Sequence, residues 1–496
     1  MLFNSYEFIF VFLPITLALF FIIGSRGHHK IAMSWLVGAS LFFYGWWNPA
    51  YLGLIMSSML FNYAIGVGLG NGKQLQRKTL LICGIIVNLS LIGYFKYANF
   101  FIDNLNSVIN NSIHLESVIL PLAISFFTFQ QIAYLVDAYK GEAKEYDFLH
   151  YCLFVTFFPQ LIAGPIVHHR EMMPQFLNRS VYRLSYNHIA AGSTIFLLGL
   201  FKKVAIADSF AFYATPVFEM AESGEPLTFF VAWGGALSYT FQLYFDFSGY
   251  SDMAIGLARM FGIKLPLNFN SPYKAVNIIE FWRRWHMTLS RFLRDYVYIP
   301  LGGNKKGKLR RYTNLLLTML LGGLWHGAGW TFVAWGGLHG FYLMVNYGWR
   351  SMRKRLGMDL TKETLLGVVL STTVTFLSVV VSWVFFRAES FTAGKNIIMA
   401  MLDISSATGI NSSNIAKFHI LFILLALFII WFAPNSQTIV FDSENRDIKF
   451  RYKWLSYFNS RLRWKPAIIS GLIIGFIFTS TLILLERKSE FLYFQF

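Results

Sequence analysis

The chain has 496 residues, of which 55% are hydrophobic, 18% are aromatic and only 14% are charged. A soluble protein is about 45–50% apolar and about 25% charged, and one soluble core could not bury 52 Phe, 25 Tyr and 14 Trp side chains. The composition predicts a polytopic membrane protein and argues against a disordered chain, a secreted disulfide scaffold and a cytosolic enzyme. The net charge of +17 is typical of a nucleic-acid-binding protein, and also of a membrane protein with basic cytoplasmic loops. The distribution of the charge along the sequence distinguishes these two interpretations.

Apolar runs follow one another along the whole sequence, and most approach the ~20 residues that a helix needs to cross a membrane. The runs lie at 8–24, 31–47, 50–69, 79–97, 117–136, 148–167, 188–206, 228–245, 313–347, 364–386, 418–433 and 466–485. They predict an all-α polytopic membrane protein with roughly 10–12 transmembrane or re-entrant helices. Because no soluble domain or internal repeat interrupts them, we expect residues 1–496 to form a single membrane domain.

Charge sets the expected orientation, because Lys and Arg collect on the cytoplasmic side of a membrane. Arg26 and Lys30 follow the first run, which places the N-terminus outside. The stretch 207–226 contains four acidic residues and no Lys or Arg, and we expect it outside as well. The stretch 263–311 contains eleven Lys and Arg residues and two acidic residues, a net charge of +9, and we expect it in the cytoplasm. The last run then leaves the C-terminus outside.

The run 148–167 does not fit simple alternation, because the loops on both of its sides are expected inside. We therefore expect it to enter the membrane and return, with a helix break at Gly164-Pro165. Non-helical backbone persists at membrane depth only where protein or water surrounds it. A broken segment therefore also points to an internal cavity.

The basic stretch 263–311 contains apolar residues at helical spacing, at 278, 281, 282, 285, 289, 292 and 293. The spacing predicts one amphipathic helix at the membrane interface. The i,i+4 pairs Glu280–Arg284 and Arg291–Asp295 would steady it. The basic residues are either a positive-inside anchor or a cytoplasmic mouth that attracts a polyanionic ligand, such as a nucleotide-bearing cofactor.

Three histidines lie in or beside apolar segments. His286 falls on the apolar side of the predicted helix, where its ring must find a partner or stay neutral. His326 lies in the stretch 322–340, whose seven glycines are explained by close helix packing, whereas its imidazole is not. An ionisable residue at membrane depth is a functional candidate, and a neutral imidazole can accept a proton from an alcohol. His339 in the same stretch is expected to cap or bridge helices.

Other polar groups have simpler interpretations. Asp246 and Ser248 are good N-cap residues for the helix that follows them, whereas Asp252 needs a partner such as Arg or His. The neighbouring histidines His168 and His169 are expected to be solvated in a basic loop. No zinc-ligand spacing, glycine-rich phosphate loop or nucleophile elbow occurs, so we expect no bound metal.

Two blocks of the sequence resemble the signatures of an enzyme family. Trp282-Arg283-Arg284-Trp285-His286 and Trp325-His326-Gly327 are similar to the two signature blocks of the membrane-bound O-acyltransferases (MBOAT), most closely those of the bacterial alginate O-acetylase branch. The segments 158–166 and 246–252 support the resemblance. The resemblance spans nearly the whole chain and is most specific at 246–340, the expected catalytic core of one membrane O-acyltransferase domain.

The resemblance implies a helical membrane fold around a central tunnel. It implies that His326 corresponds to the essential histidine of the family and that His286 is the second active-site position. It also implies a cytoplasmic acyl-CoA donor, here acetyl-CoA, used as a substrate with no bound cofactor. In the alginate branch the acetyl group crosses the inner membrane to periplasmic relay proteins, which acetylate a polysaccharide. We therefore expect such partners here, and both termini in the periplasm.

These assignments imply a mechanism. His326 accepts the proton of the attacking alcohol, and His286 donates to the oxyanion or orients the thioester carbonyl. Basic side chains attract the phosphates of the donor, and tryptophan walls exclude water. The expected substrate contacts are Trp282, Arg283, Arg284, Trp285, Arg291, Trp325, Trp330 and Asp252.

The acceptor is left open by the sequence. An exported or cell-surface polysaccharide such as alginate is expected, and acetylation of peptidoglycan or cellulose and D-alanyl transfer to teichoic acid are alternatives. A polytopic transporter or flippase is the main alternative from another class, although the sequence lacks the inverted repeats that transporters frequently show. An inactive scaffold of an export complex is a further alternative. Membrane lipid is an expected partner, whereas nucleic acid is not, because no soluble basic domain is present.

Overall fold

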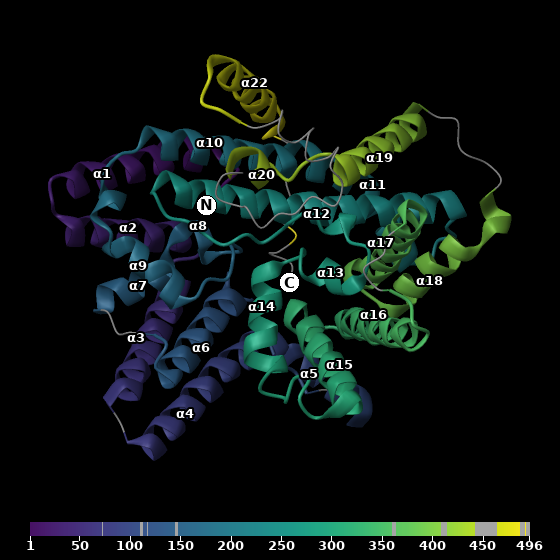
Figure 1. Ribbon diagram of the computed structural model, residues 1–496, viewed down its shortest axis with the longest axis horizontal. Helices are drawn as coiled ribbons and strands as arrows, with labels where there is room; N and C mark the ends of the chain where they lie inside the picture. The colour runs from purple at the N-terminus through teal and green to yellow at the C-terminus, as the bar shows by residue number, and fades with distance from the viewer. Residues whose placement is uncertain are drawn as a thin grey trace. The chain divides into compact units, whose positions relative to one another are not determined.

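The computed structural model of the protein describes residues 1–71, 73–109, 113–116, 118–143, 147–359, 364–407, 414–441, 464–486 and 492. Every regular element in these ranges is a helix (Figure 1), which confirms the predicted all-α class. The chain forms two compact units. The first comprises Met1–Leu200, Tyr250–Pro266 and Lys465–Arg487, and the second comprises Phe201–Gly249, Leu267–Trp464 and Lys488–Phe496.

Several helices have the length and apolarity that a membrane requires. Among the described residues there are six, Phe8–Ser25, Ala50–Gly70, Gln74–Ile109, Tyr186–Ser223, Leu365–Arg387 and Lys417–Phe441, and the shorter apolar helices are Phe391–Leu402 and Ile468–Leu484. They confirm a multi-pass membrane protein. The number of 10–12 crossings, the central tunnel, the single-domain organisation and the orientation of the termini stay predictions.

The first unit contains most of the N-terminal helices. They are η1 (Phe8–Phe12), α1 (Leu13–Ser25), α2 (His29–Gly45), α3 (Ala50–Asn71), α4 (Gln74–Ile92), η2 (Gly93–Tyr97), α5 (Ala98–Ile109), α6 (Ile124–Lys140), α7 (Phe148–Thr156), α8 (Phe158–Leu161), α9 (His169–Leu177), η3 (Arg179–Tyr182) and α10 (Tyr186–Phe201), with α22 (Ile468–Leu484) and the last residues of α12 (Phe229–Met260). Buried amides tie α3 to α4, because Asn62 and Asn88 exchange hydrogen bonds of 3.2 and 2.6 Å. Such a pair satisfies polar groups that lipid cannot.

The run 148–167 is interrupted, as predicted. α7 ends at Thr156, Phe157 has a non-helical backbone (φ −47°, ψ 104°), and the single turn of α8 ends at Leu161. The helix was expected to break at Gly164-Pro165. The break instead begins earlier in the chain, at Phe157. Residues 150–169 are all buried, which is the condition under which non-helical backbone persists at membrane depth. The re-entrant path of the run stays a prediction.

His168 and His169 are buried, so the prediction of solvated rings is wrong. His168 Nδ1 lies 3.3 Å from Oδ2 of Asp137 on α6. The ring of His169 packs against Tyr134 and Phe154, with centroids 5.4 and 5.1 Å apart, and burial lowers its pKa to about 4. These contacts could not be predicted from the local pattern, because Asp137, Tyr134 and Phe154 lie on other helices, α6 and α7.

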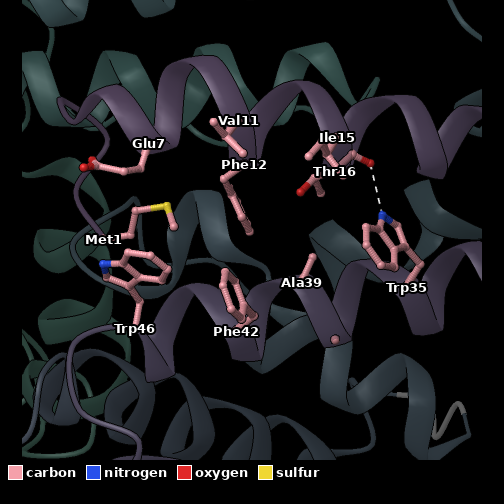
Figure 2. A pocket seen from close by; sticks show the side chains of 11 residues that line it. Met1, Glu7, Val11, Phe12, Ile15, Thr16, Trp35, Ala39, Phe42 and Trp46 are labelled. Atoms are coloured by element: carbon pink, nitrogen blue, oxygen red, sulfur yellow. Dashed lines mark hydrogen bonds between the residues drawn. The ribbon is translucent and has the colours of Figure 1, made fainter.

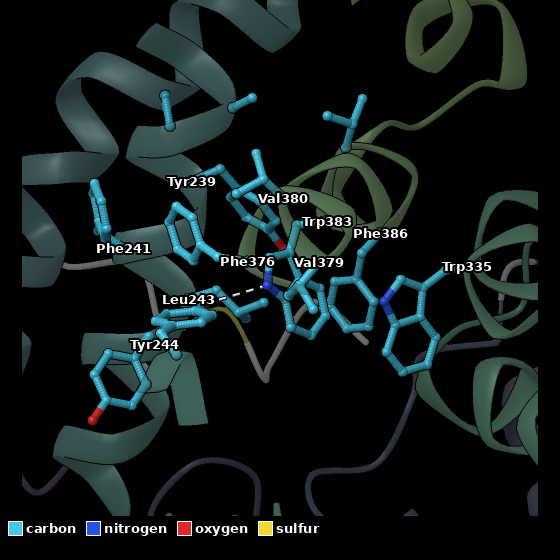
Figure 3. Packing of buried hydrophobic residues seen from close by; sticks show 14 of the residues in the cluster. Tyr239, Phe241, Leu243, Tyr244, Trp335, Phe376, Val379, Val380, Trp383 and Phe386 are labelled. Carbon is cyan, nitrogen blue, oxygen red and sulfur yellow. Dashed lines mark hydrogen bonds between the residues drawn. The ribbon is translucent and has the colours of Figure 1, made fainter. Parts of the chain in front are cut away.

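The second unit contains the remaining helices. They are η4 (Lys202–Ala207), α11 (Asp208–Ser223), α12 up to Gly249, η5 (Pro272–Lys274), α13 (Ile278–Trp282), α14 (Met287–Leu293), η6 (Arg294–Tyr298), α15 (Gly307–His326), α16 (Trp330–Arg355), α17 (Leu365–Arg387), α18 (Phe391–Leu402), η7 (Ile404–Ala407), α19 (Asn414–Phe432) and α20 (Ser436–Phe441). The core is aromatic (Figure 3). Trp335 stacks on Trp383 with centroids 5.7 Å apart, and Phe386 packs against these two rings at 5.1 and 5.3 Å. Trp383 Nε1 donates 3.2 Å to Tyr273 Oη, so this indole is buried without an unmet hydrogen bond.

Asp246 and Ser248 do not cap a helix, because α12 continues through both of them and the N-cap prediction is wrong. The Asp246 carboxylate is 1% exposed and lies 2.5 Å from Lys203 Nζ, which also contacts Asp208 at 2.7 Å. An unpaired buried charge would cost several kcal/mol. The ion pairs therefore hold η4 and the start of α11 against the middle of α12.

α15 and α16 form a hairpin in which the two backbones touch. A Cβ at Gly323 would lie 2.2 Å from the carbonyl oxygen of Phe332, and a Cβ at Gly336 would lie 2.3 Å from that of Met319. Glycine is therefore required at both positions, and close packing explains these glycines, as predicted.

Replacing Gly336 with Ala should force α15 and α16 apart and cost roughly 1–3 kcal/mol through overpacking. Thermal unfolding of the purified protein in detergent micelles should show a lower midpoint. Gly348→Ala is the matched control on α16, because a Cβ there meets nothing within 4 Å. An equal response of the two variants would contradict the close-packing explanation.

Candidate active site

The helix predicted from the apolar residues at 278–293 is broken within the first signature block. α13 ends at Trp282, α14 begins at Met287, and His286 between them has a left-handed backbone (φ 39°, ψ 56°). Such a backbone costs roughly 1–3 kcal/mol for a residue other than glycine, so its surroundings must hold it. The prediction of one continuous helix is wrong, because tertiary contacts override the apolar periodicity here.

Asn268 holds this turn through both its backbone and its side chain. Its carbonyl oxygen accepts a 2.9 Å hydrogen bond from the Met287 N–H. Its Oδ1 accepts from the Thr288 N–H at 3.3 Å and from the Thr288 hydroxyl at 2.9 Å. His286 Nδ1 lies 3.0 Å from the same Oδ1 atom. Asn268 and His286 are both fully buried, so water does not compete for these bonds.

These bonds decide which nitrogen of His286 carries the proton. A backbone N–H can only donate, so the Asn268 atom that the Thr288 N–H contacts is the amide oxygen, and His286 Nδ1 must donate to it. Burial lowers the pKa of His286 to about 3, which keeps the ring neutral at physiological pH. The proton is therefore on Nδ1, and Nε2 presents a lone pair.

Trp325 brings the two predicted catalytic histidines into one cluster. Its ring centroid lies 6.2 Å from that of His286 and 4.8 Å from that of His326. His326 is the last residue of α15 and is 4% exposed. Its ring packs against Trp335 and Phe386 at 5.0 Å each, which joins it to the core in Figure 3.

The tryptophans of the first block belong to the same cluster. Trp282 lies 5.8 Å from Trp335 and 5.1 Å from His339, and Trp285 lies 4.9 Å from Trp383. His339 is fully buried and also contacts Trp383 at 6.0 Å. It therefore bridges α13, α16 and α17, in agreement with the predicted bridging role.

Arg284 is held by its neighbours. Its Nε and Nη2 donate to Glu280 Oε1 at 3.0 and 2.9 Å, which confirms that predicted pair, and Nη1 donates to the Asn270 carbonyl at 3.1 Å. Lys274, which was not singled out from the sequence, donates to the Ala433 carbonyl at 2.6 Å. Burial and then the charge of Arg284 lower the pKa of Lys274 to about 8. Two cations are therefore close together here.

Other basic residues of the stretch face outward. Arg283 is exposed and Arg291 is half-buried. Arg294 binds Asp295 through bonds of 2.7 and 3.0 Å, and the Arg291–Asp295 pair stays a prediction. The remaining predicted contacts are Trp330, 61% exposed at the start of α16, and Asp252, buried on the part of α12 that belongs to the first unit.

Residues 47–386 match the membrane-bound O-acyltransferase family. The chain belongs to this family. The matched range includes both signature blocks and Asn268, and it confirms the resemblance inferred from the sequence. The protein is therefore a membrane O-acyltransferase.

The names of the relatives of this chain refer to different polymers. The peptidoglycan O-acetyltransferase of Helicobacter pylori is 43% identical over 100% of this chain and 98% of its own length. The probable alginate O-acetylase AlgI of Pseudomonas aeruginosa is 36% identical over 100% of both chains. The teichoic acid D-alanyltransferase of Streptococcus thermophilus is 30% identical over 50% of this chain and 62% of its own length.

The buried neutral His286 should make the fold sensitive to acid. Its pKa is about 3 in the folded state and about 6.5 in the unfolded state, so only the unfolded chain gains a proton as the pH falls below 6.5. The stabilisation is complete above that pH, and about 2 kcal/mol of it should be lost at pH 5. Thermal midpoints in micelles at pH 7 and pH 5 measure this loss.

His286→Gln is the control for this effect, because it lacks the titrating ring while His169 still titrates. The variant should lose less stability than the wild type between pH 7 and pH 5. Equal losses would show that His286 is not held neutral by the fold.

Proposed function

We propose that this acyltransferase takes an acetyl group from acetyl-CoA at the cytoplasmic side and passes it across the bacterial inner membrane for O-acetylation of a cell-surface or exported polysaccharide. The observation that carries the proposal is the pairing of His286 and His326 through Trp325 in one buried cluster of an O-acyltransferase. A cluster shielded from water suits transfer to an alcohol, because water would compete as the acceptor.

The reaction assigns proton transfer to His326. The acceptor oxygen attacks the thioester carbonyl carbon, and the acceptor proton moves to a base. The C–S bond then breaks, and the base returns the proton to the sulfur, so that CoA leaves as a thiol. We assign His326 as that base. The rings of Trp325, Trp335 and Phe386 around it exclude water from the proton transfer.

His286 does not fit the oxyanion-donor role that the sequence suggested. Its Nδ1–H is already donated to Asn268, so its ring has no further N–H to donate. Its Nε2 lone pair can instead accept a hydrogen bond from another hydroxyl of the acceptor, which would orient the attacking oxygen while its own proton goes to His326.

Trp335 is a better candidate for the oxyanion donor. Its indole Nε1–H is buried and has no hydrogen-bond acceptor in the described part of the chain. Buried N–H groups usually have a partner, and Trp335 lies 5.0 Å from His326, measured between ring centroids. Its N–H is therefore available for the charge that develops on the carbonyl oxygen.

The donor is proposed to approach from the basic stretch 263–311. Arg283, Lys305 and Lys306 have exposed side chains and can attract the phosphates of CoA without breaking an internal contact. Arg284 is instead held by Glu280, so we assign it to positioning the turn rather than to first contact with phosphate.

Peptidoglycan is the acceptor that we propose first, because a peptidoglycan O-acetyltransferase is 43% identical over 100% of this chain. Alginate is a near-equal second candidate, because the probable alginate O-acetylase of Pseudomonas putida is also 43% identical, over 81% of this chain. D-alanyl transfer has a relative that aligns with only half of this chain. Periplasmic relay proteins are proposed partners, because a cytoplasmic donor and an exported polymer lie on opposite sides of the membrane.

His326→Ala should abolish transfer from radiolabelled acetyl-CoA in membrane vesicles. Trp335→Phe keeps a ring but lacks the N–H, and should reduce transfer about 10²–10³-fold. Trp233→Phe is the matched control, because the Trp233 indole donates to the Met401 carbonyl outside the proposed machinery, and its activity should persist. Transfer by the His326 variant would refute the base assignment, and an unchanged Trp335 variant would refute the oxyanion assignment.

Deleting the gene in its native bacterium should lower the ester-linked acetate of peptidoglycan, measured on purified sacculi, and wild-type gene should restore it. Loss of acetate from an exopolysaccharide alone would instead favour the alginate-type acceptor. Absence of acetyl-CoA turnover in vesicles, with export of unmodified polymer impaired, would support the flippase alternative.

A further inference from the structure

The apolar groove of the first unit indicates no ligand. It runs between η1–α1 and α2 and has a volume of about 530 Å³ (Figure 2). At one end the Glu7 carboxylate interacts with the Met1 ammonium group. At the other end Trp35 Nε1 donates to the Thr16 carbonyl at 3.2 Å. These polar groups are already paired, and most of the remaining lining is apolar. A more selective feature lies in the second unit.

The corner between α19 and α20, residues 433–436, is tied to three neighbouring parts of the second unit. Side chains form the three hydrogen bonds: Asn435 Nδ2 donates to the Phe269 carbonyl at 2.8 Å, Lys274 Nζ on η5 donates to the Ala433 carbonyl at 2.6 Å, and Lys202 Nζ on η4 donates to Ser436 Oγ at 2.9 Å. The corner lies beyond the residues 47–386 that match the family, so its role has to follow from its contacts.

The side-chain amide of Asn435 has a fixed orientation. Its Oδ1 accepts from the Gln437 N–H at 3.4 Å and from the Ser436 hydroxyl at 3.2 Å. Because a backbone N–H can only donate, this atom is the amide oxygen, and the atom that faces the Phe269 carbonyl is the Nδ2 donor. Capping of α20 explains the bonds to the oxygen. It does not explain the N–H that Asn435 donates to a residue outside that helix.

The segment Asn268-Phe269-Asn270 connects this corner to the first signature block. The Asn268 carbonyl accepts from the N–H that begins α14. The Asn270 N–H donates to the Arg284 carbonyl at 2.9 Å, and the Asn270 carbonyl accepts from Arg284 Nη1 at 3.1 Å. The Phe269 carbonyl between them is bound by Asn435 instead. The signature block and the corner therefore hold alternate carbonyls of one short segment.

We infer that Asn435 is a positioning residue for His286, an inference that rests on the role of His286 in the proposed function. Asn268 Oδ1 receives the Nδ1–H of His286, so the position of Asn268 sets the direction of the Nε2 lone pair. Without Asn435 the carbonyl of the buried Phe269 would lose this hydrogen bond, which is costly inside a protein. The segment would move to regain a partner, and Asn268 would move with it because the two residues are joined by a peptide bond.

Asn435→Asp separates positioning from capping, because aspartate caps a helix as well as asparagine does but has no N–H for the Phe269 carbonyl. Asn435→Ser also keeps a cap and adds no charge. Side-chain ¹⁵N NMR in nanodiscs should show the His286 proton on Nδ1 alone in the wild type and a mixture of both tautomers in each variant. In vesicles kcat should fall about 10–100-fold, whereas KM for acetyl-CoA should not change, because His286 orients the acceptor and does not bind CoA.

Asn396→Asp on α18 is the matched control, because Asn396 Nδ2 also donates to a backbone carbonyl, that of Ala221, on elements that do not carry His286. Its His286 signal and its kcat should match the wild type, and the thermal midpoints of both Asn435 variants should stay close to the wild-type value. An unchanged His286 signal in both Asn435 variants would overturn the positioning role. Absence of acetyl-CoA turnover by the wild type would instead contradict the proposed function, while the NMR comparison would still decide whether Asn435 positions His286.

Discussion

One amide oxygen sets the geometry on which the rest of the site depends. Oδ1 of Asn268 accepts from Thr288 N–H, Thr288 Oγ1 and His286 Nδ1 in a fully buried position. These bonds hold His286 in a left-handed backbone, tie down the start of α14 and fix the tautomer of the imidazole. Without them the turn would carry the full cost of its strained backbone, and either ring nitrogen could hold the proton.

The helices around this turn are also held by polar groups that are buried and paired inside the protein. Lys203 on η4 forms a buried ion pair with Asp246 on α12. The residue after Asp246, Phe247, packs against the His286 ring at 4.7 Å. The ion pair thus fixes the part of α12 that covers the histidine. On the other side Trp325 connects His286 to His326, and the touching backbones of α15 and α16 hold the end of α15 in place.

The sequence predicted the features that depend on local pattern. Apolar runs predicted an all-α membrane protein, the glycines of 322–340 predicted close packing, and the two signature blocks predicted the histidines that the structure places in one cluster. It missed the break before His286, because an apolar periodicity reports burial and not a positive φ. It misread Asp246 as a helix cap, because its partner Lys203 lies 43 residues away in sequence. It did not single out Asn268 as functional, because the residues that Asn268 binds lie 18–20 residues away. Composition cannot show which distant residues form a pair. The oxyanion role expected for His286 depended on the same missing contact.

The protonation state of His286 is the central claim, and ¹⁵N NMR of the histidine side chains tests it most directly. The protein is labelled with ¹⁵N-histidine and studied at neutral pH in nanodiscs, with His286→Gln used to assign the signal. The account predicts a neutral ring with a protonated Nδ1 and an unprotonated Nε2. An imidazolium, or a ring with its proton on Nε2, would contradict the account and restore His286 as a possible oxyanion donor.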